Sequence, residues 1–194
     1  MRRPEPTRLR IIEAAYDCIG RQGLAAVTLD AAAQQAGVAR ATVYRHFPGG
    51  RDELVSAVVG WEVARFFAGV RADIGDAPDF ADYLERGLTA AHRRLQAHEV
   101  LQHALQEEAG RVLPPLATVM PLVVGVLSDD FATRLADEHL APGVEVADTA
   151  DLLARMALSH IGSPGAWDLD DPEQVRRFVR DWLLAGVLSP EPTE

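Results

Sequence analysis

The sequence predicts an all-α fold, with a small N-terminal domain followed by a larger C-terminal one. Nearly every segment spaces its apolar residues three or four positions apart, which is the period of an amphipathic helix. No segment alternates apolar and polar residues as a half-buried strand does, and clusters of glycine and proline separate the helical segments. Since 48% of the 194 residues are apolar, the chain can bury a core without disulfide bonds.

The N-terminal domain is predicted over residues 1–52, and its first helix over residues 8–20. Four apolar side chains of that helix share one face: Leu9, Ile12, Tyr16 and Ile19. A second helix begins after Thr28, whose hydroxyl can accept a hydrogen bond from a first-turn amide. It ends at Gly37, because a residue with a Cβ atom resists the left-handed conformation of such a turn.

The third helix is predicted over residues 39–46 and stops before Pro48, which has no amide hydrogen to continue it. Two short helices joined by a tight turn form a helix-turn-helix, whose second helix enters the major groove of DNA. Val43 and Phe47 lie four positions apart and are predicted to point into the domain. The remaining side chains of the third helix then face outward.

The C-terminal domain is predicted over residues 53–189 and consists of longer helices. Their expected ranges are 51–71, 79–96, 99–109, 114–139, 148–161 and 172–187. Pro172 suits the first position of the last helix, because the amide at that position has no partner within a helix. Residues 190–194 are expected to form a disordered tail.

Charge is distributed unevenly along the chain. Residues 1–51 contain eight Arg and four acidic residues, a net charge of +4, whereas the remainder contains 11 Arg and 25 acidic residues, a net charge of −14. A basic end on an acidic body suits a protein that presents one surface to DNA. The single cysteine, Cys18, excludes an intrachain disulfide and fits a reducing cytoplasm.

The chain is expected to be cytoplasmic. Its N-terminus lacks the apolar core of a signal peptide, and no apolar run is expected to reach the length that spans a membrane.

The candidate DNA contacts are short or polar side chains in and around the third helix. They are Thr28, Ala39, Arg40, Ala41, Thr42, Tyr44, Arg45, His46 and Arg51. An arginine can pair bidentately with guanine, and the methyl group of Thr or Ala can contact the methyl group of thymine. Tyr44, His46 and Thr28 are better suited to phosphates, which fix the register without discriminating between sequences.

Arg51 is expected to bind a phosphate together with backbone amides beside Gly49 and Gly50. Helix-glycine-helix segments with an exposed arginine also occur in proteins that never contact DNA. The pattern alone therefore leaves both interpretations open.

These residues resemble the signature of the tetracycline-repressor (TetR) family. The similar run is Thr28…Ala33…Ala36-Gly37-Val38…Thr42-Val43-Tyr44-Arg45-His46-Phe47-Pro48…Leu54, and Phe-Pro-Gly-Gly-Arg-Asp-Glu-Leu at residues 47–54 is similar to an actinobacterial subgroup. The resemblance covers residues 8–60 approximately; beyond them only length and helical layout agree. It implies a homodimer that binds a palindromic operator, usually as a repressor released by a small ligand in the C-terminal domain.

The sequence departs from the TetR pattern in three places. Ala39 stands where the family usually has Ser or Thr as the cap of the third helix, and loss of that cap costs about 1 kcal/mol. Ala32 replaces a usual Ile, so a loosely packed small domain is expected. Gly49-Gly50 replaces a loop that often carries Lys, and its phosphate contact is transferred to Arg51.

A regulator of this kind needs a ligand cavity in its C-terminal domain. The candidate wall residues are Trp61, Phe66, Phe67, Leu84, Leu88, His103, Met120, Val124 and Leu127. Such a lining would favour an apolar or aromatic molecule. The same residues also suit an ordinary core, and His103 also suits the surface.

No metal, cofactor or catalytic site is expected. His98 and His103 are five positions apart and cannot share a helical face as the pair in a zinc helix does. His103 and Glu107 have the required spacing, but two ligands do not complete a site. The serines at 128, 159 and 163 lack the glycine context of a nucleophile elbow.

The last two predicted helices carry apolar stripes that suit a four-helix dimer interface. The expected interface residues are Leu153, Ala157, His160, Ile161, Val175, Phe178, Val179, Trp182 and Leu183. Both stripes could instead pack within their own subunit. Two other functions remain open: a small-molecule binding protein with a vestigial helix-turn-helix, and a nucleic-acid binder without a ligand.

Overall fold

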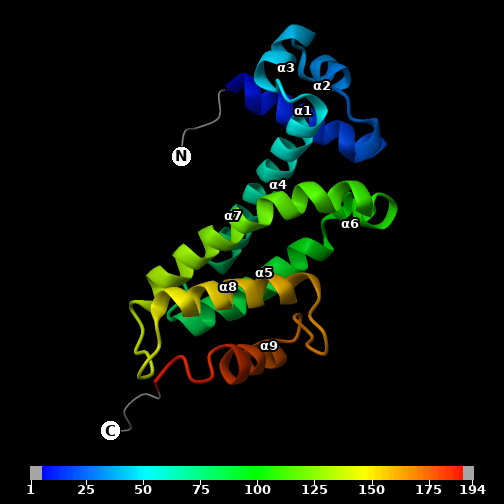
Figure 1. The fold of residues 1–194 in the computed structure, drawn as a ribbon. Helices are drawn as coiled ribbons and strands as arrows, with labels where there is room; N and C mark the ends of the chain where they lie inside the picture. The colour runs from blue at the N-terminus through cyan, green and yellow to red at the C-terminus, as the bar shows by residue number, and fades with distance from the viewer. Residues whose placement is uncertain (1–5, 190–194) are drawn as a thin grey trace. The chain divides into compact units, whose positions relative to one another are not determined.

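The computed structural model describes residues 6–189, and these form the expected all-α fold (Figure 1). In chain order the helices are α1 (Pro6–Gln22), η1 (Leu24–Ala26), α2 (Leu29–Ala36), α3 (Arg40–His46), α4 (Gly50–Ile74), α5 (Phe80–Gln96), α6 (Glu99–Glu107), α7 (Ala109–Leu135), α8 (Val146–Gly162), α9 (Pro172–Phe178) and η2 (Val179–Leu183). An isolated bridge joins Leu140 to Leu188, and no strand is present among the described residues. The predicted tail, 190–194, lies outside them.

The chain folds into two compact units, each assembled from two segments. Unit 1 consists of Met1–Arg65 and His98–Met120, and unit 2 consists of Phe66–Ala97 and Pro121–Glu194. The expected boundary at residue 52 therefore differs from the observed division. The amphipathic spacing of α4 continues past residue 52 without a break, so the sequence gives no sign that its first half packs with α1–α3.

The helix-turn-helix owes its ends to local hydrogen bonds that the sequence predicted. The Thr28 hydroxyl accepts a hydrogen bond from the Ala31 amide at 3.0 Å and caps α2. Gly37 ends α2 in the left-handed region, with φ of 63°. Ala39 precedes α3 without a side-chain cap, as its methyl group requires.

The later helices differ from prediction at their ends. α7 begins at Ala109 and continues through Pro114, Pro115 and Pro121, although these prolines were expected to interrupt or start the helix. α9 ends at Phe178 and passes into the π-helical turn η2, so the predicted helix over 172–187 is interrupted. Asp171 caps α9, and Pro172 occupies its first turn as predicted.

The core of unit 1 combines alanines with a few large side chains. Ile11, Val43 and Phe47 are fully buried, and Ala32 is equally inaccessible. Burying a side chain such as Phe47 contributes about 1.5–3 kcal/mol relative to leaving it exposed. These larger side chains hold α1, α2 and α3 together where the alanines permit close approach.

Unit 2 has its own core, which α5, α8 and α9 share. Phe80 stands edge-on to Phe131 with ring centroids 5.5 Å apart, and Leu88 and Leu153 are each 2% exposed. The Tyr83 hydroxyl donates to Asp130 at 2.6 Å, which gives the buried ring a polar partner.

α7 corrects the expectation that no apolar run reaches membrane-spanning length. Judged by length and composition alone, it is long and apolar enough to span a membrane, with a mean hydropathy of 1.6 in its most apolar window. Its prolines and glycines lie between the strongly apolar residues, so the apolar run is not evident in the sequence. Leu113, Leu122 and Val126 of this helix are more than half exposed.

Replacing Ala39 by serine should stabilise unit 1. The new hydroxyl can accept a hydrogen bond from an amide of the first turn of α3, which is worth about 1 kcal/mol. Urea unfolding of Ala39→Ser against the wild type measures the gain. Ala41→Ser, at an exposed position inside α3, is the control and should not stabilise; equal effects of the two substitutions would contradict the assignment of Ala39 as the cap position.

Candidate nucleic-acid interface

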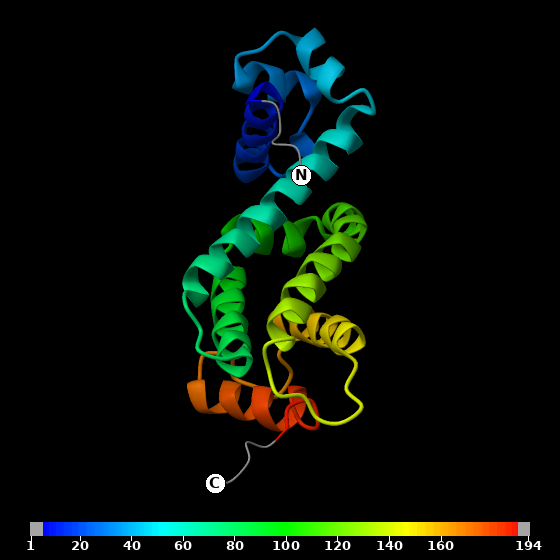
Figure 2. The ribbon, with the colours of Figure 1, turned by 90° about the vertical axis from the view of Figure 1, so that its left-hand side faces the viewer.

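α1, α2 and α3 pack against one another within unit 1, where α2 and α3 form the helix-turn-helix (Figures 1 and 2). Gly37 allows the chain to change direction between the two helices, and Val38 packs partly buried on the core. Val43 and Phe47 point inward as predicted. These contacts fix which face of α3 remains outside.

The outward face of α3 carries the predicted DNA contacts. Arg40, Ala41, Tyr44 and Arg45 are exposed, whereas Thr42 and His46 are half-buried. Thr28 and Ala39 are also exposed beside this face. The structure thus presents short and polar side chains where a base edge or phosphate could approach.

Arg40 is held by two neighbours. Its Nε lies 2.8 Å from Asp30 Oδ1, and its Nη2 donates to the Tyr44 hydroxyl at 3.1 Å. The hydrogen bond with Tyr44 and the charge of Asp30 raise the pKa of Arg40 above its already high ordinary value. The guanidinium therefore stays charged, but pairing with guanine would compete with Asp30.

Arg51 does not point outward as the sequence analysis expected. Its Nε donates to the Val27 carbonyl at 2.9 Å, and its Nη2 donates to the Leu24 carbonyl at 2.7 Å. Both acceptors lie in the connection between α1 and α2. Arg51 therefore ties the beginning of α4 to this connection.

The backbone amides proposed as an anion site are also engaged within the chain. The Gly49 amide donates to Glu53 Oε2 at 2.7 Å, and the Gly50 amide donates to the Phe47 carbonyl at 3.0 Å. The carboxylate of Glu53 thus takes the place that a phosphate was expected to occupy. Glu53 lies four residues after Gly49, a spacing that brings its carboxylate within reach of this amide.

Two carboxylates that sequence reasoning missed attach the segment His98–Met120 to the rest of unit 1. Glu108 accepts hydrogen bonds from the amides of Leu24 and Ala25. Glu62 Oε1 lies 2.8 Å from His98 Nε2. The partners are 84, 83 and 36 residues apart, so no local pattern in the sequence could indicate these contacts.

His98 caps α6 through Nδ1, which accepts a hydrogen bond from the Leu101 amide. Its Nε2 must then carry the proton that faces Glu62. Burial raises the pKa of the Glu62 carboxyl, but hydrogen bonds from His98 and Arg65 outweigh burial and hold that pKa below its usual range. His98 is thus a structural residue, and the described residues contain no group of three or more potential metal ligands.

The predicted ligand residues fall in both units. Trp61, His103 and Met120 belong to unit 1, whereas Phe66, Phe67, Leu84, Leu88, Val124 and Leu127 belong to unit 2. Trp61 packs edge-on against Tyr16 with ring centroids 5.4 Å apart, and His103 is exposed. Leu84 and Leu88 lie in the core of unit 2, which agrees with the alternative that some of these residues are plain core.

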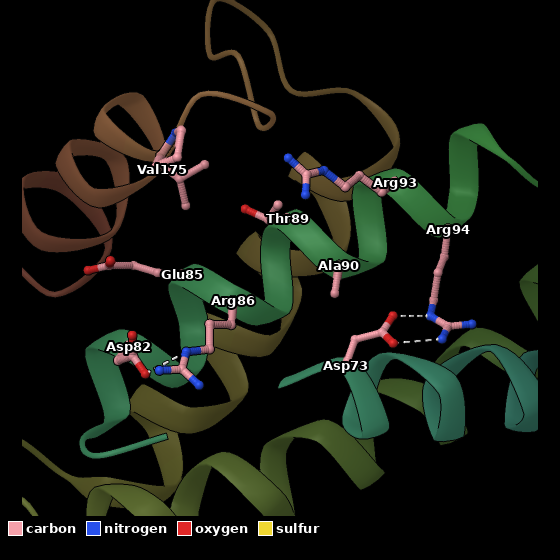
Figure 3. Close-up of a pocket in the computed structure, with 10 residues that line it drawn as sticks. Asp73, Asp82, Glu85, Arg86, Thr89, Ala90, Arg93, Arg94 and Val175 are labelled. Carbon is pink, nitrogen blue, oxygen red and sulfur yellow. Dashed lines mark hydrogen bonds and ion pairs between the residues drawn. The ribbon is translucent and has the colours of Figure 1, made fainter. Parts of the chain in front are cut away.

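A groove of about 410 Å³ on unit 2 lies among the end of α4, α5 and the start of α9 (Figure 3). None of the nine predicted ligand residues lines it. Charged side chains line it, with Arg94 paired to Asp73 and Arg86 paired to Asp82 (Figure 3). A third guanidinium, that of Arg93, pairs with Asp170. The side chains at this groove therefore differ from those of the cavity that the sequence predicted.

Most of the predicted dimer residues are buried within their own subunit. Those between 0% and 9% exposed are Leu153, Ala157, Ile161, Val175, Phe178, Val179 and Leu183. His160 is half-buried, with its ring centroid 4.5 Å from that of Phe178. Of the nine residues only Trp182, 67% exposed, offers its side chain to a partner. Helical periodicity predicts that an apolar stripe is buried, but it does not distinguish burial within the subunit from burial against a partner subunit.

Comparison with known proteins agrees with this geometry. Residues 11–58 match the model of the family described as bacterial regulatory proteins, tetR family. An uncharacterized HTH-type transcriptional regulator of Mycobacterium bovis is 29% identical over 149 residues, which are 77% of this chain and 75% of the relative.

Two solved structures share the fold. The R. erythropolis transcriptional repressor QsdR, from the TetR family, is 19% identical, with a TM-score of 0.63 over 98% of this chain and 100% of that one. The SmeT–triclosan complex is 21% identical, with a TM-score of 0.58 over the same shares. The matched residues 11–58 include α2, Gly37 and α3, the elements that expose the candidate DNA contacts. Residues 11–58 therefore belong to the tetR family of bacterial regulatory proteins, and the chain is a DNA-binding transcriptional regulator.

Proposed function

We propose that the protein is a cytoplasmic homodimeric repressor that binds a palindromic operator through α3 and releases it when a small apolar or aromatic molecule binds. The helix-turn-helix carries this proposal, because Gly37 and the buried Val43 and Phe47 hold α3 with its polar face outward. Arg45 is the side chain best suited to read a guanine. It is exposed on that face, whereas Arg40 is paired with Asp30.

The dimer supplies the second α3 that a palindrome requires. Two such helices reach successive major grooves when they lie about 34–36 Å apart. Unit 2 offers an interface different from the one the sequence suggested, since four of its large apolar side chains are exposed. They are Leu122, Val126, Leu152 and Trp182, each between 53% and 70% exposed. We place the contact between subunits on these residues.

Ligand response is supported by the solved structure of SmeT with triclosan, an aromatic molecule bound by a protein of the same fold. A ligand weakens operator binding only if it binds more tightly to a dimer whose two α3 helices no longer fit the grooves. α4 contributes residues to both units, so it is one route by which such a change travels. Of the predicted wall residues, those of unit 2 outside its fully buried core remain our candidates for the ligand site: Phe66, Phe67, Val124 and Leu127.

A second function, a small-molecule binding protein with a weakened helix-turn-helix, is favoured by two observations. Asp30 pairs with Arg40 on the outward face, and Ala39 provides no side-chain cap to α3. The salt dependence of DNA binding separates the two functions. A protein that neutralises several phosphates loses affinity steeply as salt rises, whereas a vestigial domain shows no such binding.

Selection of DNA sites from a random pool by the purified full-length protein tests the proposed function. The regulator should recover a palindrome whose half-sites are separated by one helical turn or a multiple of it. A folded dimer that enriches no sequence would instead support the small-molecule binding protein.

Arg45→Ala should weaken binding to the selected operator by about 1–3 kcal/mol, the cost of losing one bidentate base contact. The loss should be concentrated at one base-pair position, where the variant tolerates other bases. Fluorescence anisotropy with a set of singly substituted operators measures this pattern. Arg155→Ala removes an equal charge from the Asp151–Arg155 pair of α8 and is the matched control. Equal affinity of the wild type and Arg45→Ala would remove Arg45 from the contact set.

Arg51→Ala should lower the free energy of unfolding by about 1–3 kcal/mol, because the carbonyls of Leu24 and Val27 lose a charged donor. It should leave the slope of log affinity against log salt unchanged. If Arg51 instead contacted a phosphate, that slope would decrease by about 0.9. Anisotropy titrations at several salt concentrations distinguish the two roles.

Trp182→Ala and Leu152→Ala should each weaken the dimer, since large side chains at an interface centre contribute about 2 kcal/mol or more. Sedimentation equilibrium measures the dissociation constant. Leu183→Ala is the contrasting variant: its side chain is buried in the subunit, so it should reduce the stability of the fold. A dimer unaffected by both exposed substitutions would place the interface elsewhere.

A further inference from the structure

The short turn η1, between α1 and α2, is held by two side chains that come from distant parts of the chain. Glu108 accepts hydrogen bonds from the Leu24 amide at 2.9 Å and from the Ala25 amide at 2.8 Å, one to each carboxylate oxygen. Arg51 donates to the carbonyls of Leu24 and Val27. All these residues belong to unit 1. A carboxylate therefore accepts hydrogen bonds from the first two amides of the turn, and a guanidinium donates to the carbonyls of its first residue and of the residue that follows it.

The turn needs these partners because it is too short to satisfy its own amides. The first amides of any helix lack an acceptor within that helix, and η1 contains only Leu24–Ala26. The side chain of Glu108 is 14% exposed, so its charge lies where hydrogen bonds are strong and an unpaired carboxylate is costly. The two oxygens of one carboxylate can each accept a hydrogen bond from one of two consecutive amides.

Gly23, the residue before the turn, leaves the space that the Glu108 carboxylate occupies. Gly23 adopts a φ of 80°, in the region that residues with a Cβ atom rarely occupy. A Cβ atom built at Gly23 would collide with Glu108 Oε1. The missing side chain at residue 23 therefore makes room for the carboxylate from residue 108.

The position of η1 determines where α2 begins. Val27 and Leu24, at 0% and 3% exposed, fix the turn on the core of unit 1. Thr28, which follows at once, is the cap of α2. A displacement of η1 therefore moves the beginning of α2 and, through the Gly37 turn, the outward face of α3.

We infer that Glu108, at the corner between α6 and α7, is a positioning residue for the helix-turn-helix and acts on DNA binding through the amides of Leu24 and Ala25. The inference rests on DNA binding by α3, which is part of the proposed function. Glu108 is the C-cap residue of α6, and its carbonyl accepts hydrogen bonds from the amides of Arg111 and Val112 in the first turn of α7, so its backbone is fixed at this corner. The backbone of Glu108 is thus fixed by its neighbours in α7, and its side chain binds the turn η1.

An ordinary surface ion pair is the competing role for this carboxylate. Arg111 Nη1 lies 3.3 Å from Glu108 Oε2, and the arginine side chain is 60% exposed. Such exposed pairs contribute little to stability. Arg111→Ala removes the pair and leaves both hydrogen bonds to η1 in place, so it is the matched control.

The experiment compares E108A, E108Q and R111A with the wild type by anisotropy on the selected operator, at a temperature where circular dichroism shows all four folded. We expect E108A to weaken affinity by about tenfold, the size of a typical coupling between two sites. E108Q keeps one acceptor oxygen and should fall between E108A and the wild type. R111A should stay within about twofold of the wild type. Equal affinities of E108A and R111A would overturn the inference.

A double-mutant cycle with Gly23→Ala separates positioning from general destabilisation. In the wild type, Gly23→Ala introduces backbone strain and displaces Glu108; in E108A it introduces only the strain. The combined loss of operator affinity should therefore be smaller than the product of the two single losses, whereas unrelated effects would multiply.

Amide NMR shifts distinguish a failure of this inference from a failure of the proposed function. E108A should shift amides throughout α2 and α3, and R111A should not. If the wild type selects no DNA, the proposed function fails, and the shifts alone decide whether Glu108 positions the helices. Shift changes confined to η1 and the α6–α7 corner would contradict the inference.

Discussion

The backbone of residues 24–27 cannot satisfy all of its own polar groups, and we infer that the geometry of the DNA-binding unit depends on two distant side chains that bind the rest. Glu108 receives the amides of Leu24 and Ala25, and Arg51 donates to the carbonyls of Leu24 and Val27. Charged groups make stronger hydrogen bonds than neutral ones and are costly when left alone in a partly buried place. Four side-chain hydrogen bonds thus hold this short connection where α2 begins.

In the proposed function, a ligand bound to unit 2 influences the helix-turn-helix through the covalent connections between the units. The chain leaves unit 2 after Ala97 and re-enters it at Pro121, so the segment that carries Glu108 is joined to unit 2 at both ends. α4, which carries Arg51 near its beginning, also continues into unit 2. Two separate stretches of chain thus lead from unit 2 to the same turn. A ligand that favours one conformation of unit 2 needs only to alter these stretches to change operator affinity.

Local interactions were predictable from the sequence, and interactions between distant residues were not. The Thr28 cap, the Gly37 turn and the inward side of α3 depend on spacings of one to four residues, and the structure confirms them. The Glu108 contacts span more than 80 residues and leave no local pattern. The stripes of α8 and α9 are apolar as predicted, but side chains such as Leu153 and Val179 are buried inside the subunit rather than at an interface. The charge and position of Arg51 predict a phosphate ligand, but the sequence does not show the carbonyls of Leu24 and Val27 to which Arg51 donates.

Hydrogen exchange of the Leu24 and Ala25 amides tests the central claim most directly. These amides stand at the start of a three-residue turn, where no acceptor within the turn can protect them. If Glu108 holds them as described, both should exchange at least about a hundredfold more slowly in the wild-type protein than amides of an exposed loop, and E108A should remove this protection. Exchange of both amides at the rate of an exposed loop in the wild type would contradict the account.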